Sequence, residues 1–379
     1  RDNFFHCLVN AAHQFHYRTK KDERYIIAGY PWFKCRARDT FISLPGLTLS
    51  IEEQDYFELV MKTAERDLRN FMEGKPLTGK ITEMEQPDVP LWAIWAIQQY
   101  GKEAGKEQCQ KMYGKLLQDI VDYIIAQKHP NLTLEENGLL HTEGRDKAVT
   151  WMNSTANGKP VVPRTGYIVE FNALWYNALR FAASMAQDEK RVKMLEERAE
   201  LAKTSFVDVF LNEYGYLFDY VDGNMMDWSV RPNMIFAIAL DYSPLSQPQK
   251  KSVLDVCTRE LLTPKGLRSL SPKSGGYNPI YVGPQVQRDY AYHQGTAWPW
   301  LGGFYMEACL KLYKRTRLSF IERQMVGYED EMSYHCLGTI SELFDGNPPF
   351  SGRGATSFAM NVGEILRTLE LLEKYQYQF

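Results

Sequence analysis

Residues 57–71 read FELVMKTAERDLRNF, and the spacing of apolar side chains in this stretch decides the fold. The apolar side chains recur every three or four residues, at Phe57, Val60, Ala64, Leu68 and Phe71. This spacing places them on one face of an amphipathic α-helix and leaves the charged residues on the other face. Residues 171–182 and 195–209 repeat the pattern, so the sequence predicts a chain built mainly of helices.

Further stretches of the chain are compatible with helices and bring the expected number to about a dozen. These stretches are 2–17, 39–50, 88–101, 106–128, 231–241, 247–261, 293–313, 317–334 and 355–375. No fixed motif repeats along the chain, which disfavours an α-solenoid. Because no Ser/Gly-rich linker or change in composition divides the chain, we expect a single helical domain over residues 1–379.

Five long connections separate the expected helices, and they are rich in Gly, Pro, Asn and Asp. They cover residues 73–90, 129–168, 212–230, 262–292 and 335–354. Loops of this length in a compact domain are usually functional or disordered. Tryptophans, tyrosines and carboxylates populate these loops, which favours function. We therefore expect the loops to gather at one end of the domain and to form its site.

Composition and charge exclude several classes of protein. Hydrophobic residues make up 44% of the chain, charged residues 24%, and the formal net charge is −3. These values exclude a disordered chain and a basic nucleic-acid-binding arm, so no nucleic-acid partner is expected. The longest strictly apolar runs, such as residues 91–97, are far too short to span a membrane, so no membrane partner is expected either.

The cysteines and the first residues of the sequence bear on location. The six cysteines form no Cys-x-x-Cys pair, which argues against a zinc ribbon. We expect them to be free thiols in a reducing compartment, and hence a cytoplasmic protein. The sequence begins at Arg1 without a signal-peptide pattern, so we expect a domain cut from a longer polypeptide.

A set of loop carboxylates, most of them next to aromatic residues, is the strongest chemical signal in the sequence. The set consists of Asp39, Asp88, Glu143, Asp146, Glu170, Asp227, Asp289 and Glu342. Hydrolysis of a glycosidic bond needs two carboxyl groups, separated by about 6.5–9.5 Å when the reaction inverts the anomeric carbon. Taken singly, each acid is more often a helix cap or half of an ion pair. The pattern alone therefore leaves the function open.

Several segments, in the same order along the chain, resemble the C-terminal domain of glycogen debranching enzymes. The resemblance extends over about residues 24–375. It is carried by AGYPWF at 28–33, RDTFISLPGLTL at 38–49, TWM at 150–152, VEFNALWYNAL at 169–179, RPN at 231–233, AYHQGTAWPW at 291–300 and GTISELFDG at 338–346.

The resemblance implies an all-α fold of the (α/α)6 toroid type. It also implies an amylo-α-1,6-glucosidase, which releases glucose with inversion from the α-1,6 stubs of trimmed glycogen branches. The expected partner is an α-glucan such as glycogen or limit dextrin, together with an N-terminal domain of the same polypeptide. No metal or organic cofactor is implied, because protonation and water activation require neither.

By position in the resemblance, Glu342 is the expected general base that activates water. The general acid is expected directly after Thr-Trp-Met, where this chain has Asn153 instead of an aspartate. An amide cannot donate a proton as a carboxylic acid does. Glu170, in the best-matched stretch, is the first substitute, and Glu143 and Asp146 are the others.

The resemblance also implies a set of sugar-binding residues. Arg38 and Asp39 resemble the pair that holds the hydroxyls of the terminal glucose, and an arginine fork suits such dense hydrogen bonding. The stacking and wall residues are expected to come from the tryptophans Trp32, Trp92, Trp151, Trp228 and Trp298. The expected polar lining consists of Asp88, Arg231, Asn233, His293 and Gln294.

Other functions remain compatible with the sequence. Asn153 is also what a catalytically weak or inactive glucan-binding relative would show. The same toroid with another linkage specificity would give a glucoamylase-like or trehalase-like exo-glucosidase. A helical scaffold for protein interactions is disfavoured, because repeats are absent and the loops are polar and aromatic.

Overall fold

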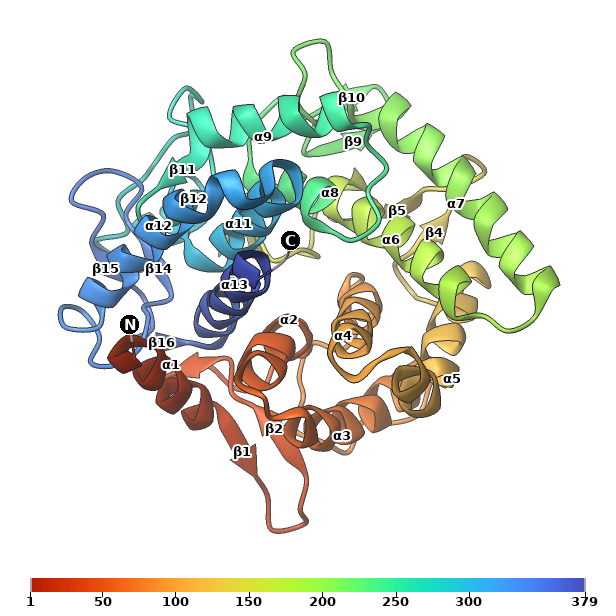
Figure 1. Ribbon diagram of the computed structural model, residues 1–379. Coiled ribbons are helices and arrows are strands. Elements are labelled where there is room, and N and C mark those ends of the chain that lie inside the picture. Colours follow the sequence, from red (N-terminus) through yellow and green to blue (C-terminus); the bar gives the residue numbers. More distant parts are fainter. Residues whose placement is uncertain (1, 378–379) are drawn as a thin grey trace.

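The computed structural model describes residues 2–377 and is rich in helix, with 54% of residues helical (Figure 1). The expectation of a mainly helical chain is therefore confirmed. The expected domain, residues 1–379, extends beyond the described residues by Arg1, Gln378 and Phe379.

Six helices form an inner ring in which each contacts the next and the last returns to the first (Figure 1). In ring order they are α2 (Ala37–Thr48), α4 (Val89–Ala104), α6 (Val169–Met185), α8 (Phe236–Ala239), α11 (Pro299–Tyr313) and α13 (Ala359–Tyr377). Every residue of α2 is buried. The contact between α2 and α13 is close, because a Cβ on Gly46 would lie 1.8 Å from the carbonyl oxygen of Gly363. Glycine at this crossing therefore lets the ring close.

A second set of helices packs against the outside of this ring. It consists of α1 (Asp2–Gln14), α3 (Gln54–Met72), α5 (Lys106–Ile125), α7 (Glu189–Phe210), α9 (Gln247–Leu261) and α12 (Leu318–Glu331). These helices bury one face each, as their periodicity predicts. In α3, for example, the buried side chains include Phe57, Val60, Ala64 and Leu68. The core thus lies between the two rings and within the inner one.

The long connections differ from the expectation because they contain short strands, none longer than three residues in the described part of the chain. One five-stranded antiparallel sheet has the order β10-β9-β8-β5-β4. Its strands are β4 (Thr133–Leu134), β5 (Leu140–Thr142), β8 (Gly166–Ile168), β9 (Tyr220–Asp222) and β10 (Met225–Met226). This sheet joins the connections 129–168 and 212–230.

A second five-stranded sheet, in the order β11-β12-β13-β14-β15, joins the connections 262–292 and 335–354. Its strands are β11 (Leu262–Thr263), β12 (Gly266–Arg268), β13 (Ala297–Trp298), β14 (Leu343–Phe344) and β15 (Gly352–Arg353). Two-stranded pairs complete the set: β1 (His16–Arg18) with β2 (Arg24–Ile26), β3 (Gly29–Tyr30) with β16 (Ser357–Phe358), and β6 (Thr155–Ala156) with β7 (Lys159–Pro160).

Some helix boundaries also differ from the expectation. The helix expected over 293–313 begins only at Pro299, because residues 297–298 pair as β13 and proline favours the first helical position. The stretch 231–241 is a 3-10 turn, η2 (Pro232–Ile235), followed by the single-turn α8. A helix that was not expected, α10 (Gln285–Ala291), lies within the connection 262–292. Further 3-10 turns are η1 (Leu49–Ile51) and η3 (Lys314–Arg317).

The state of the cysteines agrees with the expectation of free thiols. All six cysteines are free thiols, and all but Cys7 are buried. Between residues 2 and 377, no helix combines the length and the apolar character that a membrane crossing requires.

Candidate active site

Glu342 lies directly before strand β14 of the second sheet, and hydrogen bonds of its backbone and of one carboxylate oxygen hold it there. Its N–H donates to the carbonyl of Ala355, and its Oε1 accepts from the Ala355 N–H at 2.9 Å. The Asn361 amide donates to the Glu342 carbonyl at 2.7 Å. Gly354 leaves room for the carboxylate, since a Cβ there would lie 2.3 Å from Oε1. The other oxygen, Oε2, is buried and has no partner among the described residues.

The surroundings of Glu342 favour its protonated form more than water does. Burial raises the pKa of Glu342 to about 7, and the Asp39 carboxylate adds to the shift. The Ala355 N–H and the Arg36 guanidinium oppose it. Glu342 is only 2% exposed, yet its carboxyl changes charge near neutral pH and keeps one oxygen free. These are the properties of a group that can accept a proton.

Arg38 and Asp39 both lie in the first turn of α2, but they have different partners. Arg38 binds Asp88 with two hydrogen bonds, from Nε at 2.7 Å and from Nη2 at 2.8 Å. Asp39 instead pairs with Arg36 at 2.8 Å. The indole of Trp92 donates to the same Asp88 at 3.2 Å. Arg38, Asp88 and Trp92 therefore form one buried group, in which Arg38 Nη1 makes no hydrogen bond within residues 2–377.

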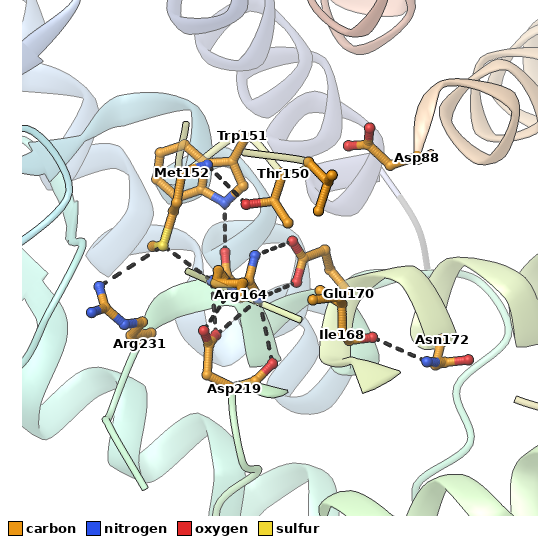
Figure 2. A network of polar contacts seen from close by, with 12 residues as sticks. Asp88, Thr150, Trp151, Met152, Arg164, Ile168, Glu170, Asn172, Asp219 and Arg231 are labelled. Carbon is orange, nitrogen blue, oxygen red and sulfur yellow. Dashed lines mark hydrogen bonds and ion pairs between the residues drawn. The ribbon is translucent and has the colours of Figure 1, made fainter. Parts of the chain in front are cut away.

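A second buried network is centred on Arg164, which sequence reasoning did not single out (Figure 2). Its guanidinium binds both oxygens of Glu170, each at 2.5 Å, and both oxygens of Asp219, at 2.7 and 3.0 Å. Asn233 donates to Asp219 at 2.9 Å, and the Trp151 indole donates to Asn233 at 2.6 Å. The network thus fixes the indole of Trp151, as Figure 2 shows.

Trp151 belongs to an aromatic wall with His293 and Trp298. The Trp151 ring stands edge-on to His293 at 5.0 Å and to Trp298 at 5.3 Å. His293 stacks on Trp298 at 5.4 Å. Both ring nitrogens of His293 are buried and unpartnered among the described residues. Burial lowers the pKa of His293 well below its usual value, and nearby arginines lower it further, so the ring is neutral and offers one donor and one acceptor.

Arg231 ties the segment of His293 to the rest of the site. Its Nη1 donates to the carbonyl of His293 at 2.8 Å, and its Nη2 donates to the side chain of Gln294 at 2.8 Å. The sulfur of Met152 lies 3.8 Å from Nη1. The structure therefore brings together Arg231, His293 and Gln294 with the wall that contains Trp151.

Other expected site residues lie differently. Trp32 is 58% exposed, and its nearest ring partner is Phe33. Trp92 packs among the rings of the inner helices, so much of it is core. Glu143 and Asp146 are exposed, and Asn153 is half-buried with no hydrogen bond within residues 2–377.

Several residues that the sequence analysis missed support this site: Arg36, Gln86, Arg164, Asp219 and Asn361. Arg36 pairs with Asp39, three positions further on. The other four residues have their partners on other elements, so neither periodicity nor spacing identifies them. The one available signal is an arginine in the polar connection 129–168, shortly before the buried start of α6.

The sequence of the whole site region matches one known family. The family described as amylo-alpha-1,6-glucosidase matches residues 9–367, which include every site residue named above. The chain belongs to the amylo-α-1,6-glucosidase family. It is therefore a member of a glycoside hydrolase family, as the resemblance in the sequence implied.

One curated relative of this amylo-α-1,6-glucosidase family member is a glycogen debranching enzyme. The glycogen debranching enzyme of Saccharomyces cerevisiae is 24% identical over an aligned length of 382 residues, and the match covers 74% of this chain. The chain matches only 25% of the length of that enzyme.

Two solved structures show the same fold at low identity. Neutral trehalase Nth1 from S. cerevisiae has a TM-score of 0.64 and 13% identity, over 95% of this chain and 76% of that one. A GH63 mannosylglycerate hydrolase from Thermus thermophilus has a TM-score of 0.63 and 11% identity, over 96% of this chain and 99% of that one. The amylo-α-1,6-glucosidase family member thus shares its helical architecture with glycoside hydrolases of other names.

Proposed function

We propose that this chain releases glucose with inversion from α-1,6-linked stubs of glycogen or a related α-glucan. The observation that carries the proposal is Glu342, a buried carboxyl with one oxygen anchored and the other free. We also propose that the two rings of helices form an (α/α)6 toroid. Residues 1–379 would then be one catalytic domain of a longer cytoplasmic protein with N-terminal domains.

Glu342 has the geometry of a general base for an attacking water. Because the Ala355 N–H occupies Oε1, the unpartnered Oε2 is the oxygen that would hold and orient the attacking water. The base takes a proton from this water while the water attacks the anomeric carbon. Proton transfer from the water to Oε2 leaves a neutral carboxylic acid, a form that the buried site favours.

The terminal glucose would bind between the Arg38 group and the wall that contains His293. Arg38 keeps Nη1 for a hydroxyl while Asp88 holds its other nitrogens. Neutral His293 offers one donor and one acceptor, which suits a sugar hydroxyl. Trp151, which is 7% exposed, would supply apolar surface for the face of a pyranose ring, and the buried Trp298 supports it from behind.

The proton donor is the unusual part of this site. Asn153 cannot serve as an acid, and Glu143 and Asp146 are exposed. Glu170 has both oxygens on Arg164, which opposes the rise in its pKa that burial produces. These contacts favour a positioning role for Glu170, so its assignment as general acid stays a prediction.

Asp289 is a further carboxylate beside the segment of Asn153. The Ser154 hydroxyl donates to the Asp289 carbonyl at 2.6 Å. Burial raises the pKa of Tyr281 to about 12, and the carboxylates of Glu342 and Asp289 both contribute to that shift. Tyr281 thus lies near both carboxylates, and Asp289 is the next residue to test as a proton donor.

Glu170→Gln should destabilise the fold while leaving most of the activity. We expect a loss of about 3 kcal/mol in unfolding free energy, because a buried charge pair is broken. The turnover number should fall less than about tenfold, since the amide still occupies the same space. Urea unfolding and glucose release measure the two effects.

Asp219→Asn is the matched control, because it removes the other carboxylate from the same guanidinium. Both variants should show the same pattern. A loss of 100-fold or more in turnover for Glu170→Gln alone, with unchanged stability, would identify Glu170 as the acid instead.

Linkage and anomer analysis tests the proposed function directly. The chain should release glucose from glycogen limit dextrin and from short α-1,6 glucosides, with little release from α-1,4 or α,α-1,1 glucosides. The first product seen by proton NMR should be β-glucose, because inversion converts an α-glycoside into the β-anomer. Preference for another linkage would favour a glucoamylase-like or trehalase-like exo-glucosidase.

A catalytically weak glucan-binding relative is the second candidate function, and Asn153 is the observation that favours it. Binding of glycogen without glucose release at any pH between 4 and 8 would support this function and contradict the first.

A further inference from the structure

A separate cavity of about 600 Å³ lies between the end of α9 and the loops that follow α7, β10 and β12. It is lined by aromatic residues of the connection 212–230, by Arg259 and Glu260 of α9, and by residues 271–274. None of the residues to which the proposed function gives a role in catalysis or glucose binding lines it. The aromatic residue Trp228, named as a stacking candidate in the sequence, lies here.

The aromatic side of the cavity is exposed and held in place. Tyr214 is 69% exposed and Trp228 is 44% exposed, with ring centroids 5.9 Å apart. Phe218 packs edge-on against Trp228 at 4.6 Å, and the Tyr216 hydroxyl donates to the Trp228 carbonyl at 2.8 Å. Large aromatic faces held open to solvent mark binding sites, and they suit the apolar faces of sugar rings.

The polar side of the cavity offers hydrogen-bond donors and acceptors to a ligand with many hydroxyl groups. Arg259 is exposed, and its side chain forms no ion pair or hydrogen bond within residues 2–377, so the five donors of its guanidinium are available. Lys273 forms an ion pair with Glu260, with its Nζ 3.2 Å from Oε1. Charges of both signs beside serine hydroxyls offer donors and acceptors together, as a sugar requires.

The cavity shares a wall with the candidate active site. Val230 lines the cavity, while the next residue, Arg231, contacts Gln294 in the active site. The Ser271 N–H donates to the Val230 carbonyl at 3.0 Å, which fixes this wall. Arg231 lies only three positions after Trp228, a backbone span of at most about 10 Å.

We infer that this cavity is an auxiliary binding site for the α-1,4-linked glucose chain that carries the branch. The inference rests on the proposed function for the nature of the polymer. A second contact on the same polymer raises its local concentration at the active site without a change in the chemistry. The site therefore affects large branched glucans and leaves short substrates unaffected.

Trp228→Ala and Tyr214→Ala test the inference. Each variant should bind glycogen about tenfold or more weakly in affinity electrophoresis, and the double variant should lose more. Calorimetric titration with maltoheptaose should show the same loss. Turnover of a short oligosaccharide with one α-1,6-linked glucose should stay within twofold of the unmodified chain.

Tyr334→Ala is the matched control, because Tyr334 is an 82% exposed aromatic residue that does not line the cavity. This variant should bind glycogen as the unmodified chain does. Unchanged glycogen and maltoheptaose binding in folded Trp228→Ala and Tyr214→Ala would overturn the inference.

The binding measurements need no turnover, so the two proposals fail separately. The unmodified chain could fail to hydrolyse α-1,6 linkages while the two cavity variants still bind glycogen more weakly than it does. That result would uphold the auxiliary site and contradict the proposed activity.

Discussion

Glu342→Gln is expected to lower glucose release about 10²- to 10⁴-fold while leaving the fold and glucan binding intact. The amide has the same shape as the carboxylate, and its oxygen still accepts the Ala355 N–H. It has no basic oxygen for the water at the position of Oε2. Glucose release from limit dextrin and glycogen affinity measure the two properties, and near-normal turnover would contradict the assignment of Glu342 as base.

The same variant is also expected to change the stability of the fold, and this change tests the pKa of Glu342 independently of turnover. Because burial raises the pKa of Glu342 to about 7 in the native chain, the native state binds a proton more tightly than the unfolded state. Glu342 therefore lowers stability as pH rises from about 4.5 to 7, by up to about 3 kcal/mol. Relative to the unmodified chain, Glu342→Gln should gain stability between pH 5 and pH 8.

Activity of the unmodified chain should fall as pH drops through about 7, since the base becomes protonated.

Asn153→Asp is expected to raise glucose release about 10²- to 10⁴-fold, because it supplies a carboxylic acid where the family resemblance places one. Asn153 is half-buried and makes no hydrogen bond within residues 2–377, so the exchange of NH2 for an oxygen breaks no contact. Both chains are to be compared on limit dextrin across pH 4–8.

Asn153→Ala controls for the loss of the amide and should show no gain. If the unmodified chain releases glucose and Asn153→Asp does not raise the rate, the proton donor is a residue other than the one at position 153. Asp289→Asn would then be the next variant, because Asp289 adjoins Ser154.

The sequence predicted the helices well where one face of a helix is buried. In α3 and α7 the apolar spacing was visible because these helices lie in the outer ring, against the inner one. The short strands could not be predicted, because two or three residues are too few for an alternating pattern. Helix α10 is likewise too short for a periodic signal, and α8 forms only part of the helix expected over 231–241.

The partners of the site residues were beyond sequence reasoning. Arg38 and Asp39 are adjacent in sequence, yet each has its own partner: Arg38 binds Asp88, fifty positions away, and Asp39 binds Arg36. Their expected role in holding the terminal glucose stays a prediction. Arg164 holds Glu170 and Asp219 from a loop without a recognisable motif. Such pairs depend on how the ring closes. Residue types could be predicted from the family resemblance, while their contacts required the structure.

The crossing of Gly46 in α2 and Gly363 in α13 has a consequence for synthesis of the protein. During translation the early helices leave the ribosome long before α13 does, so the inner ring stays open until then. Asn361, which anchors the Glu342 carbonyl, is also in α13. A nascent chain therefore exposes apolar helix faces and lacks an ordered base until late in its synthesis. Contacts between such distant segments form slowly, so closure of the inner ring is expected to be a late and slow step of folding.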